Sequence, residues 1–292
     1  MKIKIGISPI AWLNDDMPML SKGITVEKCL SDIVKCGYTG VENCGSFPKE
    51  KQKIQRLLKK FNLKFSGGWY SANLLQNSVD VEFKKMKKIL EVFKEMKTKN
   101  IVFCETTNSV QGKNIKLSRR PSILDIENKN FFSKLNNLAE IVKKKFNVNI
   151  CYHHHMGTLI QNEKEIDLLM NNTSKNIKLL LDTGHLIFAG IEPMKIYKKY
   201  QSRISHVHLK DLRKDILKKC LRYDTSFLKS FINGVFTVPG DGFYDFKPLL
   251  SKLKKNNYNG WVIVEAEQDP KKYSPYTYSL MGYNNVKKIL KI

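Results

Sequence analysis

The feature that most constrains the fold of this chain is an alternation of two patterns, which continues from one end of the chain to the other. Short apolar runs rich in β-branched residues predict strands, and longer stretches with apolar residues three or four apart predict helices. We predict eight strands, at residues 3–7, 40–42, 64–69, 101–105, 149–153, 177–182, 204–210 and 260–267. Eight strands that alternate with helices favour an α/β fold, a single (β/α)₈ TIM barrel, which typically needs roughly 250 residues.

The helices expected between these strands have clear starts and ends. Thr25 can accept a hydrogen bond at the start of the first helix, and Gly37 follows its last residue. Asp245 stands where it can cap the last predicted helix. Seven helices are predicted, at residues 25–36, 48–61, 79–96, 130–146, 162–171, 193–200 and 246–253.

Two connections are much longer than the others, at about residues 106–129 and 211–245. We expect both to lie near the mouth of the barrel, at the end where active sites form. No internal repeat and no linker rich in Pro, Gly and Ser interrupts the chain. We therefore predict one domain over residues 1–292.

The sequence disfavours several other classes of protein. The first predicted strand is followed by Ser8-Pro9-Ile10-Ala11 and not by a glycine-rich turn, which argues against a dinucleotide or nucleoside triphosphate site. No apolar run approaches the roughly 18 residues of a membrane span, and the first residues lack the pattern of a signal peptide. The six cysteines form no Cys-x-x-Cys pair, so we expect a cytoplasmic protein with no disulfide framework and no membrane partner.

The formal net charge of +24 raises the question of a nucleic-acid partner. However, 45 of the 51 basic residues are Lys, whereas proteins that recognise nucleic acid rely on Arg for bidentate contacts. The lysines are also spread along the predicted helices, for example at Lys84, Lys85, Lys87 and Lys88. We therefore predict that the charge lies on solvated outer faces and that nucleic acid is not a partner.

All six histidines fall at the predicted ends of three neighbouring strands, beside several carboxylates. Active sites of barrels form at the carboxyl ends of the strands, so these side chains are expected to converge. Mixed imidazole and carboxylate ligands suit Mn²⁺, Co²⁺, Zn²⁺ or Fe²⁺, whereas oxygen ligands alone would suit Mg²⁺ or Ca²⁺. We predict one divalent cation, bound by members of the set His153, His154, His155, Asp182, His185, His206, His208, Glu265 and Glu267.

The spacing of these residues divides them further. Residues two apart on a strand point to the same face, so one member of such a pair can reach a cation at the barrel axis. The other member is expected to lie higher, where a substrate would bind. Three pairs have this spacing: His153 with His155, His206 with His208, and Glu265 with Glu267.

Polar and aromatic residues at the ends of the other predicted strands are candidates for substrate contacts. The tryptophans can offer an apolar face to a ring of hydroxyl groups, and the polar residues can hydrogen-bond its edge. The residues assigned to the substrate are Trp12, Asn14, Asp15, Trp69, Glu105 and His185. Three alternatives stay open, namely packing alone for Trp12, an ordinary turn at residues 14–16, and an ion pair for Glu105; Glu42 is interpreted as structural.

These motifs resemble those of known barrels. The residues that end the last four strands, with Asp182-Thr183-Gly184-His185 among them, are similar to the xylose-isomerase-like superfamily of sugar isomerases, epimerases and endonuclease IV. Six longer segments resemble the inosose dehydratase family of myo-inositol catabolism, and the triple histidine and residues 265–270 are the most specific of them. The six segments are residues 6–18, 152–158, 182–185, 206–211, 236–242 and 264–270.

The resemblance implies dehydration of 2-keto-myo-inositol (scyllo-inosose) to trihydroxycyclohexane-1,2-dione, with Mn²⁺ or Co²⁺ and in some assays glutathione. It also assigns the cation to Asp182, His208 and Glu265, and the fourth ligand position falls on His153. Isomerases and epimerases of the superfamily carry an acid/base Glu at that fourth position. The histidine therefore weakens the first alternative, a sugar or keto-polyol isomerase or epimerase.

A dehydration needs a base that removes the proton beside the ketone and an acid that protonates the departing hydroxyl. We assign the base to Glu265 or His155 and the acid to Lys210 or Glu267. The sequence leaves both choices open.

A second alternative is a DNA-repair nuclease like endonuclease IV. Its three zinc ions need additional histidines from the second and third strands, and this chain has no histidine before His153. We therefore expect a small polyol ketone as the partner of the site. A homo-oligomer is expected only by analogy with other barrels.

Overall fold

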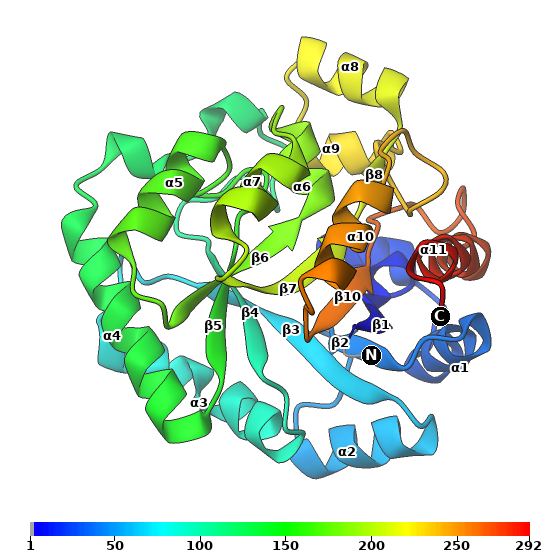
Figure 1. Cartoon of the computed structure of the whole chain (residues 1–292), viewed down its shortest axis with the longest axis horizontal. Helices are drawn as coiled ribbons and strands as arrows, with labels where there is room; N and C mark the ends of the chain where they lie inside the picture. Colours follow the sequence, from blue (N-terminus) through cyan, green and yellow to red (C-terminus); the bar gives the residue numbers. More distant parts are fainter. Residues whose placement is uncertain (1–2) are drawn as a thin grey trace.

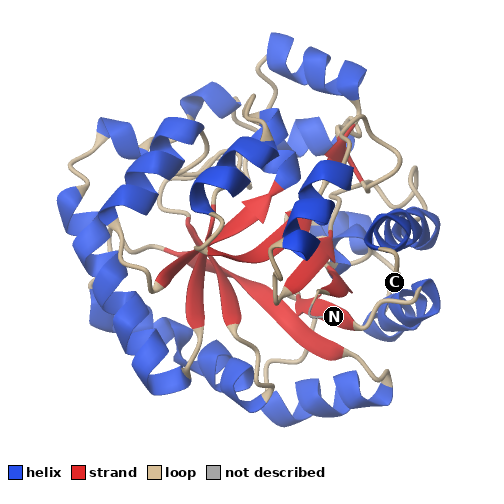
Figure 2. Cartoon of the chain, in the orientation of Figure 1, coloured by secondary structure: helices blue, strands red, loops and turns tan. Residues whose placement is uncertain are grey.

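Eight parallel strands close into a barrel at the centre of the molecule, and helices surround it (Figure 1 and Figure 2). The structure is a computed structural model and describes residues 3–292. Around the barrel the strands follow the order β1, β10, β7, β6, β5, β4, β3, β2. The predicted TIM barrel is confirmed, and every predicted strand overlaps an observed one. Their bounds are β1 Lys4–Ile7, β2 Gly40–Asn43, β3 Lys64–Ala72, β4 Asn100–Glu105, β5 Asn149–His153, β6 Ile177–Asp182, β7 Ile204–Leu209 and β10 Trp261–Val264.

The outer helices begin and end close to the residues that the sequence indicates. The Thr25 side chain accepts a hydrogen bond from the Lys28 N–H at the start of α1, and Gly37 ends this helix with a φ of 99°. At α10 the N-cap residue is Phe246 and not Asp245, although the Asp245 carboxylate still accepts a hydrogen bond from the helix. The helices around the barrel are α1 Val26–Cys36, α2 Lys51–Lys60, α3 Val79–Glu95, α4 Lys129–Phe146, α5 Glu163–Asn172, α7 Pro193–Tyr200, α10 Lys247–Lys255 and α11 Pro275–Leu290.

Helix α11 is not among the predicted helices. Gly282 lies in its middle, where it interrupts the apolar pattern. Glycine is also a poor helix former, so the sequence does not favour a helix there. The structure gives the reason for the glycine, since a Cβ there would lie 2.9 Å from the Val264 side chain and 3.1 Å from that of Val238. Glycine therefore allows α11 to pack closely against the barrel.

The two long connections contain short elements and contact each other. The connection from β4 to α4 holds η3 Leu117–Arg119 and η4 Ile123–Asp125. In the connection from β7 to α10 lie β8 Asp211–Leu212, α8 Lys214–Arg222, α9 Phe227–Ile232 and β9 Phe236–Thr237. The N–H and Oγ of Ser118 both donate hydrogen bonds to Asp224, and Ser226 Oγ donates to Asn114. Three further short elements are η1 Pro9–Ala11, η2 Pro18–Ser21 and α6 Thr183–Phe188.

Helix α3 shows how the sequence divides between core and surface. Met86 and Leu90 are buried against the barrel, while the lysines around them, including Lys84 and Lys88, are exposed. The predicted lysine-rich outer face is thus present on this helix. All six cysteines are buried and carry free thiols. Within residues 3–292, no helix is long and apolar enough to span a membrane.

Candidate active site

A cavity of about 230 Å³ lies at the carboxyl ends of the barrel strands. Its walls come from β1, β2, β3, β4, β5, β7 and β10 and from the segments that follow them. The cavity is lined by Ser8, Ile10, Leu13, Asp15, Asp16, Glu42, Asn43, Cys44, Trp69, Ser71, Val102, Gln111, His153, His155, His208, Glu265 and Glu267. The predicted convergence of histidines and carboxylates at this end of the barrel is therefore present.

Three of these side chains, together with Asp182 beside the cavity, form a group that we call the cation group: His153, Asp182, His208 and Glu265. All four are buried, and their potential ligand atoms lie within 4.8 Å of one another. His208 Nδ1 is 2.9 Å from Glu265 Oε2 and 3.5 Å from Asp182 Oδ2, and His153 Nε2 is 3.6 Å from Asp182 Oδ2. Ligands at about 2.1 Å from one ion are about 3.0 to 3.5 Å apart, so these separations suit a divalent cation.

Asp182 Oδ2 adds a second reason to expect a cation. It is buried and accepts no hydrogen bond within the described part of the chain, whereas Oδ1 accepts one from the His185 N–H at 2.9 Å. A buried carboxylate oxygen without a partner is rare because desolvation makes it unfavourable. The residues present therefore fit a metal ion.

A hydrogen bond sets the imidazole of His153 in a form that can bind a metal, whereas His208 lies between two carboxylates. His153 Nδ1 lies 2.6 Å from the His154 carbonyl oxygen, which can only accept, so Nδ1 carries the proton and Nε2 keeps its lone pair. Burial holds the pKa of His153 well below its usual range, which keeps the ring neutral. Burial also lowers the pKa of His208, but Glu265 and Glu42 outweigh burial and hold it well above the usual range.

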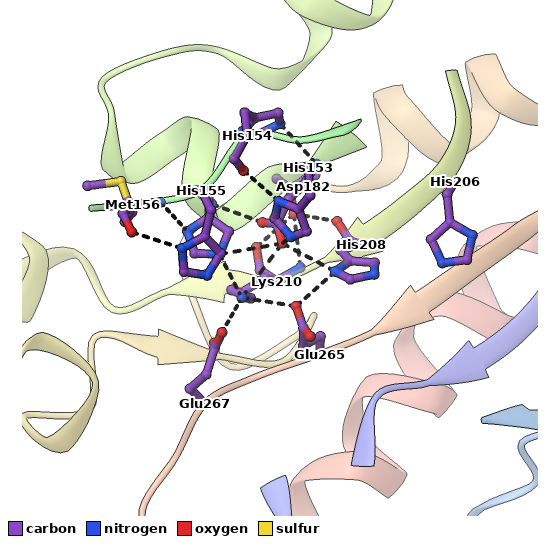
Figure 3. Close-up of polar contacts among 12 residues, drawn as sticks. His153, His154, His155, Met156, Asp182, His206, His208, Lys210, Glu265 and Glu267 are labelled. Atoms are coloured by element: carbon purple, nitrogen blue, oxygen red, sulfur yellow. Dashed lines mark hydrogen bonds and ion pairs between the residues drawn. The ribbon is translucent and has the colours of Figure 1, made fainter. Parts of the chain in front are cut away.

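A second group lies beside the first, and we call it the lysine group: His155, His185, Lys210 and Glu267. Figure 3 shows the Lys210 side chain between Glu265 and Glu267. Lys210 Nζ donates to Glu267 Oε1 at 2.6 Å and lies 3.0 Å from Glu265 Oε2 and 3.2 Å from His185 Nε2. Gly184 makes room for this fully buried lysine, because a Cβ there would lie 2.5 Å from Lys210 Cγ.

Burial and charge set the protonation of the lysine group. Burial lowers the pKa of Lys210, but the carboxylates of Asp182, Glu265 and Glu267 outweigh it and raise the pKa above its usual range. Burial raises the pKa of Glu267 to about 7, although the Lys210 ammonium acts in the opposite direction. The ammonium is therefore permanent, while Glu267 can carry a proton near neutral pH.

His155 has one ring nitrogen, Nε2, without a hydrogen-bond partner among residues 3–292. Its Nδ1 lies 2.8 Å from the Met156 carbonyl oxygen and must donate to it, which leaves the lone pair on Nε2. Burial lowers the pKa of His155 to about 3, so the ring is neutral at physiological pH. The ring centroids of His185, Phe227 and Trp69 lie 3.8, 4.9 and 5.4 Å from that of His155, so aromatic rings hold it in place.

The residues assigned to the substrate divide in two. Trp69 and Asp15 line the cavity, but both Asp15 carboxylate oxygens accept from the Gly45 N–H, at 3.0 and 2.8 Å. Within the described chain, the other four side chains do not line the cavity. Trp12 donates to Asp32, Asn14 accepts from the Met17 N–H, Glu105 accepts from the N–H groups of Leu74 and Thr107, and His185 contacts Lys210.

One expectation from strand alternation is wrong. His206 does not lie above its partner near the substrate, because it precedes His208 and is therefore one pleat further from the carboxyl end of β7. Its Nε2 is 2.7 Å from Glu42 Oε1, and the ring is fully buried. The rule holds for β5 and β10, where the candidate ligand is the first member of each pair.

Several cavity residues were not predicted as part of the site, and Asp16 and Gln111 are two polar examples. Burial raises the pKa of Asp16 to about 6. Gln111 comes from the long connection after β4, and its Oε1 is buried without a hydrogen-bond partner in residues 3–292. The neighbouring Asp15 was a signal for Asp16, but Gln111 lies in a loop whose path the sequence pattern does not indicate.

Comparisons with known proteins agree with this geometry. The family model described as "Xylose isomerase-like TIM barrel" matches residues 30–279. Inosose dehydratase from Clostridium tetani (strain Massachusetts / E88) is 42% identical over 282 residues, which cover 96% of this chain and 94% of that protein. Rhizopine catabolism protein MocC from Rhizobium meliloti is 38% identical over 98% of this chain and 88% of its own length.

A solved structure supports the fold independently. The probable 3-DHS dehydratase AsbF from Bacillus anthracis superimposes with a TM-score of 0.72 over 96% of this chain and 97% of that one, at 12% identity. At this identity the likeness concerns the fold alone. The chain therefore belongs to the xylose isomerase-like TIM barrel family, among relatives that include curated inosose dehydratases.

Proposed function

We propose that this protein is a metal-dependent hydro-lyase that dehydrates 2-keto-myo-inositol to trihydroxycyclohexane-1,2-dione in myo-inositol catabolism. The observation that carries the proposal is the set of unpaired acceptors at the cavity. Glu267 Oε2 and Gln111 Oε1 line it, Asp182 Oδ2 lies in the adjoining cation group, and all three are buried without a hydrogen-bond partner among residues 3–292. A cation and a ring of hydroxyl donors together would satisfy them. Relatives named inosose dehydratase, at about 40% identity over nearly the whole chain, support this substrate.

The cation would be held by the four residues of the cation group. Its mixed nitrogen and oxygen ligands suit Mn²⁺, Co²⁺, Zn²⁺ or Fe²⁺, and the resemblance to the inosose dehydratase family favours Mn²⁺ or Co²⁺ among them. A divalent cation supplies Lewis-acid polarisation of a carbonyl oxygen when it is bound. The resemblance to the family adds glutathione as a component to test in the assay.

His155 is the base that the geometry favours. Its Nε2 lone pair is free, the ring is neutral, and the residue lines the cavity. Glu265, the alternative base, already lies 2.9 Å from His208 Nδ1 and 3.0 Å from Lys210 Nζ. A carboxylate engaged by two neighbours has less freedom to remove a proton than an imidazole with an open nitrogen.

Glu267 is the favoured acid. Lys210 Nζ anchors its Oε1 at 2.6 Å, while Oε2 has no partner within the described residues and the side chain lines the cavity. Lys210, the alternative acid, is fully buried behind these carboxylates. We therefore assign proton donation to the departing hydroxyl to Glu267, and to Lys210 the task of holding Glu267 in place.

Trp69 would cover the apolar face of the ring. It lines the cavity, and its ring centroid lies 5.6 Å from that of His153 and 5.4 Å from that of His155. An apolar wall at this point excludes water from the reacting face and strengthens the electrostatic interactions within the cavity.

The decisive experiment supplies purified protein with scyllo-inosose and Mn²⁺ and follows the ultraviolet absorbance of the enolised dione. Absorbance that grows with time and depends on the metal supports the proposal, and parallel assays with Co²⁺ and with glutathione define the cofactors. If the substrate is instead epimerised and no dione forms, the protein is an isomerase or epimerase on the same barrel.

A further inference from the structure

A third buried polar cluster lies beside the cation group, formed by Glu42 of β2 and His206 of β7. His206 Nε2 is 2.7 Å from Glu42 Oε1, and His208 Nε2 is 3.3 Å from the same carboxylate. The three side chains are buried. Neither the acid/base chemistry nor the cation group proposed above uses Glu42 or His206.

The imidazole of His208 connects this cluster to the cation group. Its Nδ1 faces Glu265 and Asp182, at 2.9 and 3.5 Å, while its Nε2 faces Glu42. A carboxylate can only accept, so Nε2–H donates to Glu42, and Nδ1, which faces Glu265 and Asp182, is the nitrogen that would give up its proton to bind a cation. In metal sites generally, a carboxylate in this position fixes the orientation of the ring and makes it a better ligand.

The backbone around Glu42 and His206 is shaped for this contact. The register between β2 and β3 shifts between Val41 and Glu42, and the register between β6 and β7 shifts just before His206. Register shifts of this kind re-aim side chains beside active sites. Gly67 of β3 completes the arrangement, because a Cβ there would lie 2.9 Å from Glu42 Oε1.

We propose that Glu42 is a positioning residue that holds His208 in the orientation and tautomer needed to bind the cation. His206 in turn holds Glu42 by donating its Nε2–H. The inference rests on the proposed cation site. It assigns Glu42 a role that an ion pair with His206 alone would not have, since a purely structural pair would not change the affinity for metal.

The test is the affinity of the apoprotein for Mn²⁺, measured by isothermal titration calorimetry in the absence of substrate. Glu42→Gln removes the charge and keeps the shape, and we expect its dissociation constant for Mn²⁺ to rise by roughly 10- to 100-fold. Glu82→Gln is the matched control, because Glu82 is a fully buried carboxylate that accepts from Tyr70 and Asn77 and lies on α3. We expect its Mn²⁺ affinity to equal that of the wild type.

A second readout separates positioning from a direct role in catalysis. Turnover by Glu42→Gln should approach the wild-type rate when Mn²⁺ is raised well above its new dissociation constant. Should Glu42→Gln fail to fold by circular dichroism, His206→Phe replaces it, because this change releases Glu42 without altering the number of carboxylates. We expect the variant to bind Mn²⁺ more weakly than the wild type.

The outcomes that overturn the inference are distinct. Wild-type affinity for Mn²⁺ in a folded Glu42→Gln or His206→Phe protein would show that the cluster is structural, and the proposed function would stand. A wild-type protein that binds no divalent cation would overturn both the inference and the cation site. A wild type that binds Mn²⁺ but does not dehydrate scyllo-inosose would leave the role of Glu42 intact and remove only the proposed reaction.

Discussion

The cation group and the lysine group are built from the same four strand ends, yet they are chemically different. The ends of β5, β6, β7 and β10 each give one residue to the cation group and another, two or three positions later, to the lysine group. The pairs are His153 with His155, Asp182 with His185, His208 with Lys210, and Glu265 with Glu267. Strand alternation produces three of these pairs, and the first turn of α6 produces that of Asp182 with His185. Together they form two tiers, with the lysine group nearer the mouth.

The two tiers differ in whether their charges are balanced from within. The lysine group contains its own permanent cation, and Lys210 lies 2.6 Å from Glu267. The cation group has two carboxylates and only neutral or proton-dependent imidazoles, and Asp182 Oδ2 has no hydrogen-bond partner in the described chain. The lysine group thus has a permanent cation of its own, although Glu267 Oε2 has no hydrogen-bond partner among residues 3–292. The cation group has no permanent cation of its own and shares Lys210, whose Nζ lies 3.0 Å from Glu265 Oε2 and 3.6 Å from Asp182 Oδ2. Each prediction below tests this distinction.

The largest effect is expected from Asp182→Asn. This change removes the charge that a divalent cation needs but keeps an oxygen that can accept from the His185 N–H, so α6 retains its cap. Asp182→Ala would lose that cap as well, which makes Asn the cleaner test. We expect turnover to fall by about 10³-fold or more, measured with scyllo-inosose at saturating Mn²⁺. Retained activity would mean that Asp182 is not a ligand.

The second prediction concerns Lys210→Met, which removes the internal cation of the lysine group. Glu267 and Glu265 would lose their buried partner, and breaking a buried pair typically destabilises a protein by about 3–5 kcal/mol. We expect a loss of this size in the free energy of unfolding, measured with urea. Lys84→Met on the exposed face of α3 is the control and should cause little change. An equally stable Lys210→Met protein would contradict the idea that this tier is balanced by its lysine.

Removal of metal tests the cation group. A cation that binds only the folded protein adds about 3–4 kcal/mol when its concentration is 100 to 1,000 times its dissociation constant. We expect a chelator to lower the melting temperature of the wild type and of Lys210→Met by this linkage. The same treatment should leave Asp182→Asn unchanged. A melting temperature that does not respond to the chelator in the wild type would show that the cation group is stable without an ion.

The sequence was sufficient to predict the barrel and most of the two tiers, for a physical reason. Parallel strands buried on both faces read as apolar runs, and the first polar residues after each run must lie at the active-site end. The four residues of the cation group stand at such positions, and the structure brings them together. Helix α11 was not predicted because Gly282 interrupts its apolar pattern. The glycine is present because α11 packs closely against the barrel at that point.

The partners of individual side chains at strand ends and in loops could not be predicted in the same way. Asn14 and Glu105 stand at strand ends but bind backbone N–H groups, and nothing in the sequence separates such a role from a substrate contact. Gln111 reaches the cavity because the connection after β4 folds over it, which depends on tertiary contacts such as that of Ser118 with Asp224. Glu42 was interpreted as structural, and its partners His206 and His208 lie more than 160 positions away in the chain, so the sequence alone does not indicate the contact.

Asp211 extends the comparison to a buried carboxylate that has neither a metal nor a lysine as partner. Its Oδ1 accepts from the N–H groups of Leu212 and Tyr244, and Oδ2 is buried without a partner in residues 3–292. Burial raises the pKa of Asp211 to about 6, more than these hydrogen bonds lower it. The proton is therefore bound more tightly in the folded state than in the unfolded state, where the pKa is 3.8.

The sign of the resulting pH dependence follows from this difference. The contribution of Asp211 to stability is fully present below pH 3.8 and is lost as the pH rises through about 6. Relative to Asp211→Asn, which does not titrate, the wild type should lose about 2–3 kcal/mol of unfolding free energy between pH 4 and pH 8. Urea unfolding of both proteins at each pH measures this change, with Asp215→Asn, at an exposed carboxylate of α8, as the control. A wild type that gains stability relative to Asp211→Asn over this range would show that the backbone N–H groups outweigh burial, so that a carboxylate can be balanced there without a cation.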